Sequence, residues 1–181
     1  MMRFISFRFV NPPVVFPIEY SYQAESDNSI GDVVRVRCEE FPVPELTSFF
    51  AQMSKPIMNK MFGLDVANAR QPFRFAIYGL EVRPASDKKP WTEEVAFNLM
   101  LGLPGHEIKT KTPYFGLFDC YSGSYPKTRE NENPDVLGEE NTFVVRQLID
   151  RCMAYINGER AQTVLEFEED KEQTLPGLVE E

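Results

Sequence analysis

The sequence predicts an α+β protein with a mainly antiparallel sheet of about five to seven strands, three helices and an acidic C-terminal tail. Apolar and polar residues alternate in several short stretches bounded by turn residues, which is typical of strands. In other stretches apolar residues recur every three or four positions, which indicates helices. The charge is also unevenly distributed: residues 1–128 contain 14 basic and 14 acidic residues, whereas residues 129–181 contain 5 and 14, which accounts for the formal net charge of -9.

A single domain is expected over residues 1–167, followed by the acidic tail at 168–181. The hydrophobic share of 43%, with 15 Phe and 7 Tyr, is enough for an ordinary core. Three widely spaced cysteines do not suggest a disulfide framework; they favour a reducing, cytoplasmic location, in the host cell if the protein is viral or phage-encoded. Because no stretch approaches the ~20 apolar residues of a membrane span, no membrane association is expected.

Three strands are expected in the first third of the chain, at 2–10, 16–23 and 33–38. The third has the clearest alternation, because Arg35 and Arg37 fall on one face and apolar side chains fall on the other. Turn residues between the second and third strands predict that these two pair in an antiparallel way.

Strict alternation along the first strand also predicts which of its side chains share a face. Phe7 and Phe9 are expected on one face, whereas Phe4 and Arg8 are expected on the other. An exposed aromatic ring would then lie beside a basic side chain on the same surface.

A helix is expected at 44–62, where Pro44 suits the first helical position and apolar residues recur at helical spacing. Pro56 lies within this stretch, so the region is expected to be either one kinked helix or two short ones. A strand with a bulge at Gly79 is then expected at 73–82.

The middle of the chain is expected to form a second helix at 92–102, because Thr92 is a good N-cap and two acidic residues follow it. Residues 106–112 and 114–121 are expected to form two short strands, or a hairpin broken at Pro113.

The last third begins with a polar segment at 122–138, which is long for a plain connection and is expected to be mobile or functional. The strongest helical pattern of the chain follows at 142–156, and Asn157 with Gly158 is expected to end it. A final strand is expected at 161–167.

Catalytic and phosphate-binding motifs are not found in the sequence, so no cofactor, no metal site and no catalytic residue is predicted. His106 is the single histidine, and its spacing from the three cysteines matches no familiar zinc pattern. Cys120 lies between aromatic residues and is interpreted first as a small apolar residue. A small enzyme using His106 or Cys120 stays open as a third function.

The charge division favours a non-enzymatic protein that binds another protein, as an inhibitor or adaptor of a nucleic-acid-processing complex. Its acidic surface would imitate nucleic acid if the two acidic segments, 129–140 and 161–181, met on one face. The residues expected to bind the partner are Glu130, Glu132, Asp135, Glu139, Glu140, Glu166, Phe167, Glu168, Glu169 and Asp170.

The alternative is a single-stranded nucleic-acid-binding protein whose acidic tail regulates it. Arginines near aromatic residues on strands would follow phosphates while the rings stack on bases, and this layout resembles that of single-stranded DNA-binding proteins. The competing interpretation is that the rings point inward and each arginine pairs with a glutamate. The residues expected to bind nucleic acid are Arg8, Arg35, Arg37, Arg74 and Tyr78.

Overall fold

The structure is a computed structural model that describes residues 2–12, 17–24, 31–62, 74–103, 106–120 and 134–160. In these residues the chain forms one antiparallel seven-stranded sheet and two α-helices, which confirms an α+β fold with a mainly antiparallel sheet. Two helices, and not three, are present among the described residues. Neither is long and apolar enough to cross a membrane.

The strands are ordered β3-β2-β1-β4-β5-β6 across the sheet, and β7 also pairs with β5. The three N-terminal strands are present, and β2 and β3 pair in an antiparallel way as predicted. The bounds of the strands are β1 Met2–Phe9, β2 Ile18–Ala24, β3 Val33–Cys38, β4 Arg74–Pro84, β5 Glu93–Leu103, β6 His106–Lys111 and β7 Phe115–Gly116.

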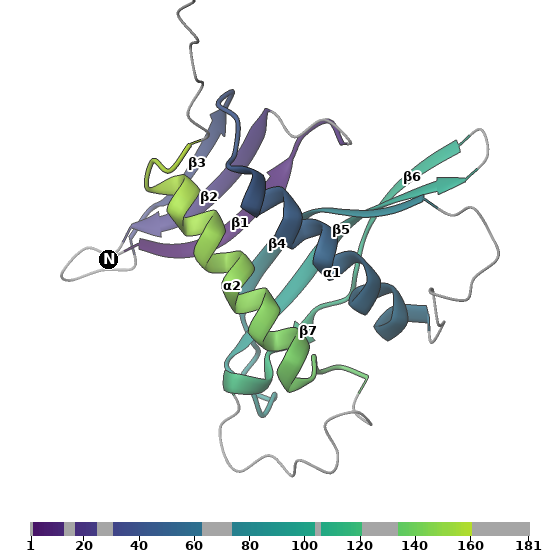
Figure 1. The fold of residues 1–181 in the computed structure, drawn as a ribbon. Coiled ribbons are helices and arrows are strands. Elements are labelled where there is room, and N and C mark those ends of the chain that lie inside the picture. The colour runs from purple at the N-terminus through teal and green to yellow at the C-terminus, as the bar shows by residue number, and fades with distance from the viewer. Residues whose placement is uncertain are drawn as a thin grey trace, which may run out of the picture.

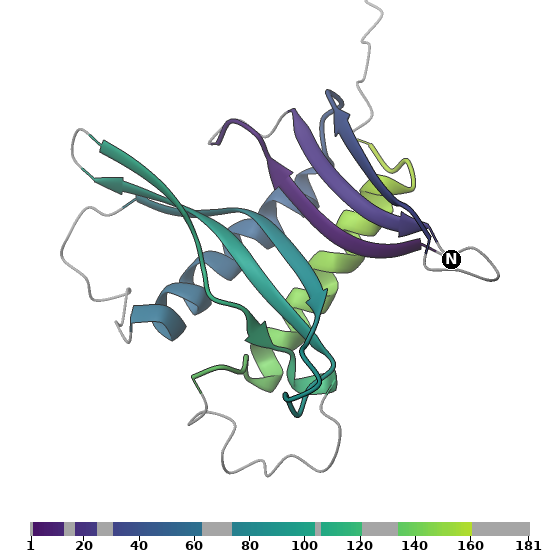
Figure 2. The ribbon, with the colours of Figure 1, turned by 180° about the vertical axis from the view of Figure 1, so that it is seen from behind.

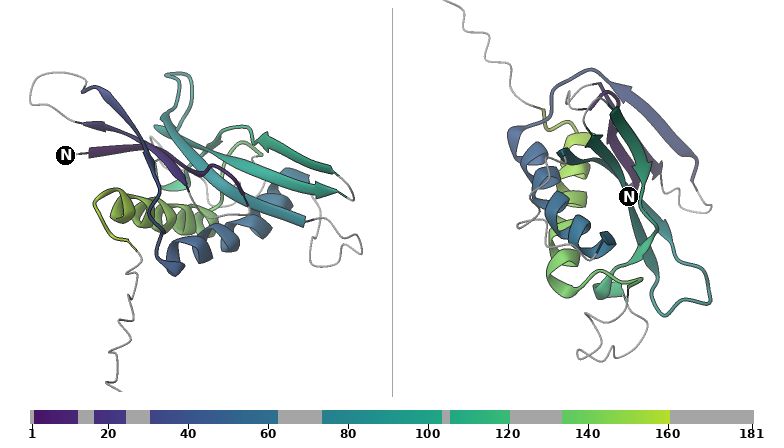
Figure 3. Two further views of the ribbon diagram at one scale, coloured as in Figure 1. Left: turned by 90° about the horizontal axis from the view of Figure 1, so that it is seen from above. Right: turned by 90° about the vertical axis from the view of Figure 1, so that its right-hand side faces the viewer.

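The two helices, α1 (Pro44–Phe62) and α2 (Glu139–Ile156), lie side by side on one face of the sheet (Figures 1 and 3). Neither helix covers the opposite face, which Figure 2 presents to the viewer. α1 continues through Pro56 as one helix. α2 begins three residues earlier than predicted and ends as predicted, with Gly158 at a φ of 106° just beyond it.

The helix predicted at 92–102 is wrong, because this segment is strand β5. β5 has β4 on one side and β6 and β7 on the other. Its successive residues Val95, Ala96 and Phe97 are all fully buried, although they point to alternate faces. A strand that is buried on both faces loses its polar–apolar alternation, so its apolar residues also fit a helical spacing.

The face predicted for Phe4 is also wrong, because a bulge at Ile5 shifts the register of β1 against β2. Strict alternation therefore fails at this point, and Phe4 turns to the same side as Phe7 and Phe9. All three rings are buried in the core, while Arg8 stays exposed on the other face.

The bulge predicted near Gly79 is confirmed, since the register of β4 against β5 shifts between Ile77 and Gly79. Gly79 also lies against β1: a Cβ atom there would be 2.5 Å from the Cβ of Arg8 and 2.7 Å from the carbonyl oxygen of Phe7. Only glycine lets the two strands approach this closely.

The segments predicted as a hairpin around Pro113 do not pair with each other. β6 and the two-residue strand β7 both pair with β5, and a 3-10 turn follows at Phe118–Cys120. Of the segment 122–138, only residues 134–138 are described, and Val136 and Leu137 there are fully buried. The strand predicted at 161–167 and the tail lie outside the described residues.

Phe7, a fully buried residue of β1, lies where the sheet contacts both helices. Its ring stacks on Phe50 of α1 with centroids 5.8 Å apart and meets Tyr155 of α2 edge-on at 5.5 Å. Phe7 therefore links the sheet to both helices.

Phe7→Ala should lower the free energy of unfolding by about 3–5 kcal/mol, because it opens a cavity where three elements meet. Urea unfolding followed by far-UV circular dichroism measures the change. Phe143→Ala is the control, since that ring is 62% exposed on α2 and its loss should change stability by less than about 0.5 kcal/mol. Equal losses in the two variants would contradict the central position of Phe7.

Gly79→Ala should cost about 1–3 kcal/mol through the forced separation of β1 and β4. Asn98→Ala is its control, because Asn98 pairs with Gly79 across β4 and β5 and already carries a Cβ atom, so an alanine there adds no new atom to the backbone. Thermal unfolding of both variants gives the comparison, and a neutral Gly79→Ala would show that the two strands can separate at no cost.

Candidate binding surface on the uncovered sheet face

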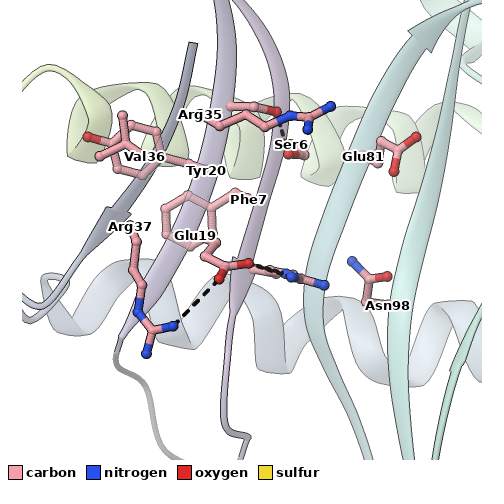
Figure 4. Close-up of a pocket in the computed structure, with 11 residues that line it drawn as sticks. Ser6, Phe7, Glu19, Tyr20, Arg35, Val36, Arg37, Glu81 and Asn98 are labelled. Carbon is pink, nitrogen blue, oxygen red and sulfur yellow. Dashed lines mark hydrogen bonds and ion pairs between the residues drawn. The ribbon is translucent and has the colours of Figure 1, made fainter. Parts of the chain in front are cut away.

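A polar depression of about 540 Å³ lies on the uncovered face of the sheet, across the first five strands (Figure 4). Strand alternation after the bulge in β1 points polar side chains of neighbouring strands to this face. The residues that line it are Ser6, Phe7, Arg8, Glu19, Tyr20, Ser21, Arg35, Val36, Arg37, Glu81 and Asn98.

Glu19 lies between two of the three arginines of the depression. Its carboxylate accepts a hydrogen bond of 2.9 Å from Nε of Arg8 and lies 3.9 Å from a guanidinium nitrogen of Arg37. Arg35 is exposed and has no acidic partner among the described residues. The single carboxylate of Glu19 thus neutralises part of the charge of Arg8 and Arg37, and Arg35 has no acidic partner among the described residues. This side of the depression therefore carries a net positive charge.

Ser6 and Ser21 lie on adjacent strands of the same face, and their hydroxyl oxygens are 2.6 Å apart. Ser21 is nearly fully buried, whereas Ser6 is half-buried. Together with the amide of Asn98 they supply neutral hydrogen-bonding groups beside the arginines (Figure 4).

Glu81 marks the other side of the depression and is held by two groups from the edge of the sheet. Lys111 Nζ donates to its carboxylate at 2.7 Å, and the hydroxyl of Tyr114 also donates to it. The guanidinium of Arg83 lies 3.4 Å from the centre of the Tyr114 ring. Glu81 is thus already partnered, and the charge available to a ligand lies on the arginine side.

These contacts set the charge of both partners. Partial burial alone would raise the pKa of Glu81, but the hydrogen bonds from Lys111 and Tyr114 outweigh it and hold that pKa below its ordinary value. Burial alone would lower the pKa of Lys111, but its bonds to Glu81 and Tyr114 raise it. Both groups are therefore charged at neutral pH.

β3 is the outer strand of the sheet on the arginine side, since it pairs only with β2 among the described strands. The amide of Ala24 donates to the carbonyl of Asp32, which fixes this residue pair as hydrogen-bonded. Antiparallel pairs alternate, so the backbone groups of Arg35 and Arg37 point away from β2, toward the edge. β3 therefore presents backbone hydrogen-bonding groups and two basic side chains together.

The predicted acidic surface is only partly described. Asp135, Glu139 and Glu140 are exposed around the first turn of α2, while Glu130, Glu132 and residues 166–170 lie outside the described residues. The description ends at Arg160, beyond the opposite end of α2, and an 18-residue helix is about 27 Å long. The described acidic residues and the start of segment 161–181 are thus separated by the length of the helix.

The predicted nucleic-acid-binding residues are divided by the structure. Arg8, Arg35 and Arg37 share the exposed face, as predicted for a basic strand surface. The aromatic rings expected beside these arginines are not exposed on that face. Phe4 and Tyr20 are buried, and Tyr78 is half-buried against the core. Of Arg74, at the start of β4, only the backbone is described.

The two candidates for catalysis are separate in the fold. His106 is exposed at the start of β6, and its side chain makes no hydrogen bond or ion pair with the described residues. The thiol of Cys120 donates to the carbonyl of Leu117 at 3.1 Å and accepts from the amide of Glu93 at 3.3 Å, so it is used in local backbone contacts. In the described parts of the chain, no three His, Cys, Asp or Glu side chains are grouped as metal ligands.

The sequence pattern did not identify Ser6, Ser21, Glu19, Glu81 or Asn98 as members of one site. In β2, Glu19 and Ser21 alternate with the buried residues Ile18 and Tyr20. This alternation is the sequence feature that could have placed Glu19 and Ser21 on the uncovered face. Asn98 could not be assigned to this face from the sequence, because the pattern of its segment predicts a helix where the structure has strand β5.

The hydrogen bonds of Glu81 should make stability depend on pH in the acid range. Because its folded-state pKa is lowered, the stabilisation is complete above its ordinary value near pH 4.5 and is lost as pH falls further. Glu81→Gln should therefore cost about 1 kcal/mol at pH 7 and progressively less below about pH 4.5. Urea unfolding of the wild type and the variant, at pH 7 and again in the acid range, measures how this stability difference depends on pH.

Glu107→Gln is the matched control, since Glu107 is exposed on β6 and makes no ion pair with the described residues. A stability difference for Glu81→Gln that stayed constant with pH would show that the carboxylate charge does not contribute.

Comparison of the chain with protein-family models, with curated proteins and with solved structures finds no match. Its function must therefore be inferred from its own residues.

Proposed function

We propose that this protein is a non-enzymatic binding protein that holds an extended, acidic segment of a protein partner along β3 and the uncovered face beside it. The observation that carries this proposal is Arg35, an exposed arginine without an acidic partner among the described residues, beside Arg37 on the outer strand of the sheet.

An extended peptide can add to such an edge as a further strand. Its backbone would bond to the outward-pointing groups of Arg35 and Arg37, which supplies affinity. Alternate acidic side chains would reach the two guanidinium groups on the uncovered face, which supplies specificity. The other side chains would cover Val34 and Val36, which are only half-buried.

The simpler interpretation of this edge is that charged side chains on an outer strand prevent aggregation. Arg37 and Arg8 fit that interpretation, because both are near Glu19. Preventing aggregation requires only an exposed charge on the outer strand. Arg35 in addition lines a depression that contains hydroxyl and amide groups. The depression beside the edge therefore favours a binding role.

Single-stranded nucleic acid is the second candidate for this surface, favoured by the three arginines on one face. Binding without sequence preference also uses aromatic rings that stack on bases. The buried positions of Phe4 and Tyr20 weigh against such stacking. An acidic protein segment is thus the better fit.

Docking through the acidic residues of the last third stays a separate proposal, in which the protein inhibits or adapts a nucleic-acid-processing complex. The exposure of Asp135, Glu139 and Glu140 at one end of α2 supports it. Two of these carboxylates also stabilise the helix start, which is the alternative explanation for their position.

Binding of a short fluorescent peptide that alternates glutamate with valine tests the edge directly. Fluorescence anisotropy at low salt should detect binding that weakens as salt rises. Arg35→Glu combined with Arg37→Glu should weaken it at least about tenfold, because both attractive charges become repulsive.

Lys55→Glu combined with Lys88→Glu is the matched control, since it makes the same charge change at exposed positions outside this face. Equal weakening in both double variants would reduce the effect to net charge and contradict the proposal. Binding of single-stranded oligothymidine that depends on the arginines, without peptide binding, would assign the surface to nucleic acid instead.

A further inference from the structure

We infer that strand β6, at the opposite edge of the sheet from β3, is the surface through which two copies of this chain pair. β6 is the outer strand on its side and pairs only with β5 among the described strands. All six of its residues are exposed. Figures 1 and 2 show β5 and β6 projecting beyond both helices, so neither helix covers this edge.

The hydrogen bonds to β5 decide which residues of β6 point their backbone groups outward. The amide of Thr112 donates to the carbonyl of Phe97 at 2.9 Å, which makes these two a hydrogen-bonded pair just beyond β6. Such pairs alternate along an antiparallel ladder, so the even-numbered residues of β6 bond to β5. The backbone groups of Glu107, Lys109 and Lys111 therefore point to the open edge.

The charges at these outward positions are complementary to themselves. A second copy that adds as an antiparallel strand must place its outward residues opposite those of the first copy. When the pairing is centred on Ile108, Glu107 of each copy lies opposite Lys109 of the other. Pairing centred on Glu107 or on Lys109 would place that charge opposite itself, and pairing centred on Thr110 would oppose Lys109 and Lys111. The charge pattern thus selects one register.

Neither Glu107 nor Lys109 is engaged by a carboxylate or a cation of its own chain. The side chain of Glu107 makes no hydrogen bond or ion pair with the described residues. Lys109 contacts the ring of Tyr78, with its Nζ 6.0 Å from the ring centre, which is the outer limit of a cation–π contact. Both charges are therefore available to a second copy.

Ile108 supplies the apolar part of the contact. It is 45% exposed, and it lies opposite half-buried Leu101 of β5. In the selected register Ile108 faces itself in a non-hydrogen-bonded pair, in which Cα atoms about 4.5 Å apart bring the side chains together. Each isoleucine would then be covered by the other.

The simpler interpretation is that lysines on an outer strand prevent pairing. Glu107 argues against it, because a carboxylate two positions from Lys109 turns repulsion between two copies into attraction. β3 has no such feature: it contains Arg35 and Arg37 and no acidic residue, so two β3 strands could not exchange opposite charges. β6 therefore fits a second copy, and β3 does not.

The pairing surface is small, so the dimer is weak. One pair of six-residue strands buries less surface than a standard stable interface. The dimer is therefore expected at high protein concentration and dissociates on dilution, and unfolding of dilute protein reports on the single chain.

Pairing through β6 leaves both β3 edges open. The two copies are related by a two-fold axis, and the two sheets become continuous with one β3 at each outer end. A consequence that rests on the proposed function follows: a partner with two acidic segments could bind both edges of one dimer and gain from their linkage.

Charge reversal tests the pairing in the full-length protein. Sedimentation velocity over a series of concentrations should show a monomer–dimer equilibrium for the wild type. Glu107→Lys and Lys109→Glu should each weaken self-association at least about tenfold, because each makes both cross-strand pairs repulsive. An equimolar mixture of the two variants should restore the dimer, since opposite charges then face each other at both positions. The combined variant Glu107→Lys/Lys109→Glu should dimerise like the wild type.

Asp150→Lys and Lys88→Glu are the matched controls, since they make the same charge changes at exposed positions outside β6. Each should dimerise like the wild type, and mixing them should add nothing. Glu107→Lys also makes the chain less acidic, so an effect of net charge alone would strengthen self-association instead of weakening it.

A disulfide tests the register. In Ile108→Cys, mild oxidation of concentrated protein should link two copies through position 108, because opposite residues in a strand pair have the separation that a disulfide needs. In Thr110→Cys the two introduced thiols lie four residues apart along the strands, about 14 Å, and should not link. Peptide mass spectrometry distinguishes these links from links through the three native cysteines.

Three results would overturn this inference: a wild type that stays monomeric at the highest soluble concentration, self-association that survives both charge reversals, or equal cross-linking of the two cysteine variants. Hydrogen exchange adds a fourth. Slow exchange of the Glu107 and Lys109 amides that does not depend on protein concentration would assign the edge to another part of the same chain.

Binding of the glutamate peptide separates this inference from the proposed function. If a protein that stays monomeric binds the peptide through Arg35 and Arg37, the proposed function stands and the β6 pairing fails. If the dimer forms as expected but the peptide does not bind, the proposed function fails and the β6 pairing stands.

Discussion

The contact of Phe7 with Phe50 and Tyr155 holds the sheet and both helices together. Because both helices take the same side, the sheet has one face that they bury and one that they leave uncovered. The bulge at Ile5 adds Phe4 to the buried side and leaves Ser6 and Arg8 on the other. The polar depression is therefore a consequence of how the core is filled.

The uncovered face is not uniformly charged, and the pairing of its carboxylates decides where a ligand would bind. Glu81 is held by Lys111 and Tyr114 at one side. Glu19 lies near both Arg8 and Arg37, so one carboxylate offsets two cations. The remaining positive charge is centred on Arg35, on the strand whose backbone edge is open among the described residues. Charge and hydrogen-bonding capacity thus coincide on β3.

Much of the fold could be predicted because local patterns there agree with tertiary burial. β3 alternates cleanly since only one of its faces packs on the core, and α1 and α2 have one apolar face each. The pattern fails in β5, where both faces are buried, and at Ile5, where one extra residue changes the face of Phe4. The strands that flank β5 cannot be recognised from the spacing of one segment, and the bulge at Ile5 has no glycine to mark it, whereas Gly79 marks the bulge in β4.

By itself the sequence determined the fold class, the faces of β3 and the division of charge along the chain, because these depend on residue types at short spacing. Only the tertiary structure decided that Arg8, Arg35 and Arg37 share a depression with Ser6 and Asn98. These residues come from three strands, β1, β3 and β5, and their meeting depends on strand order, on the bulge in β1 and on both helices taking one side. Such long-range pairing is set by how the whole core packs, and no local pattern contains it.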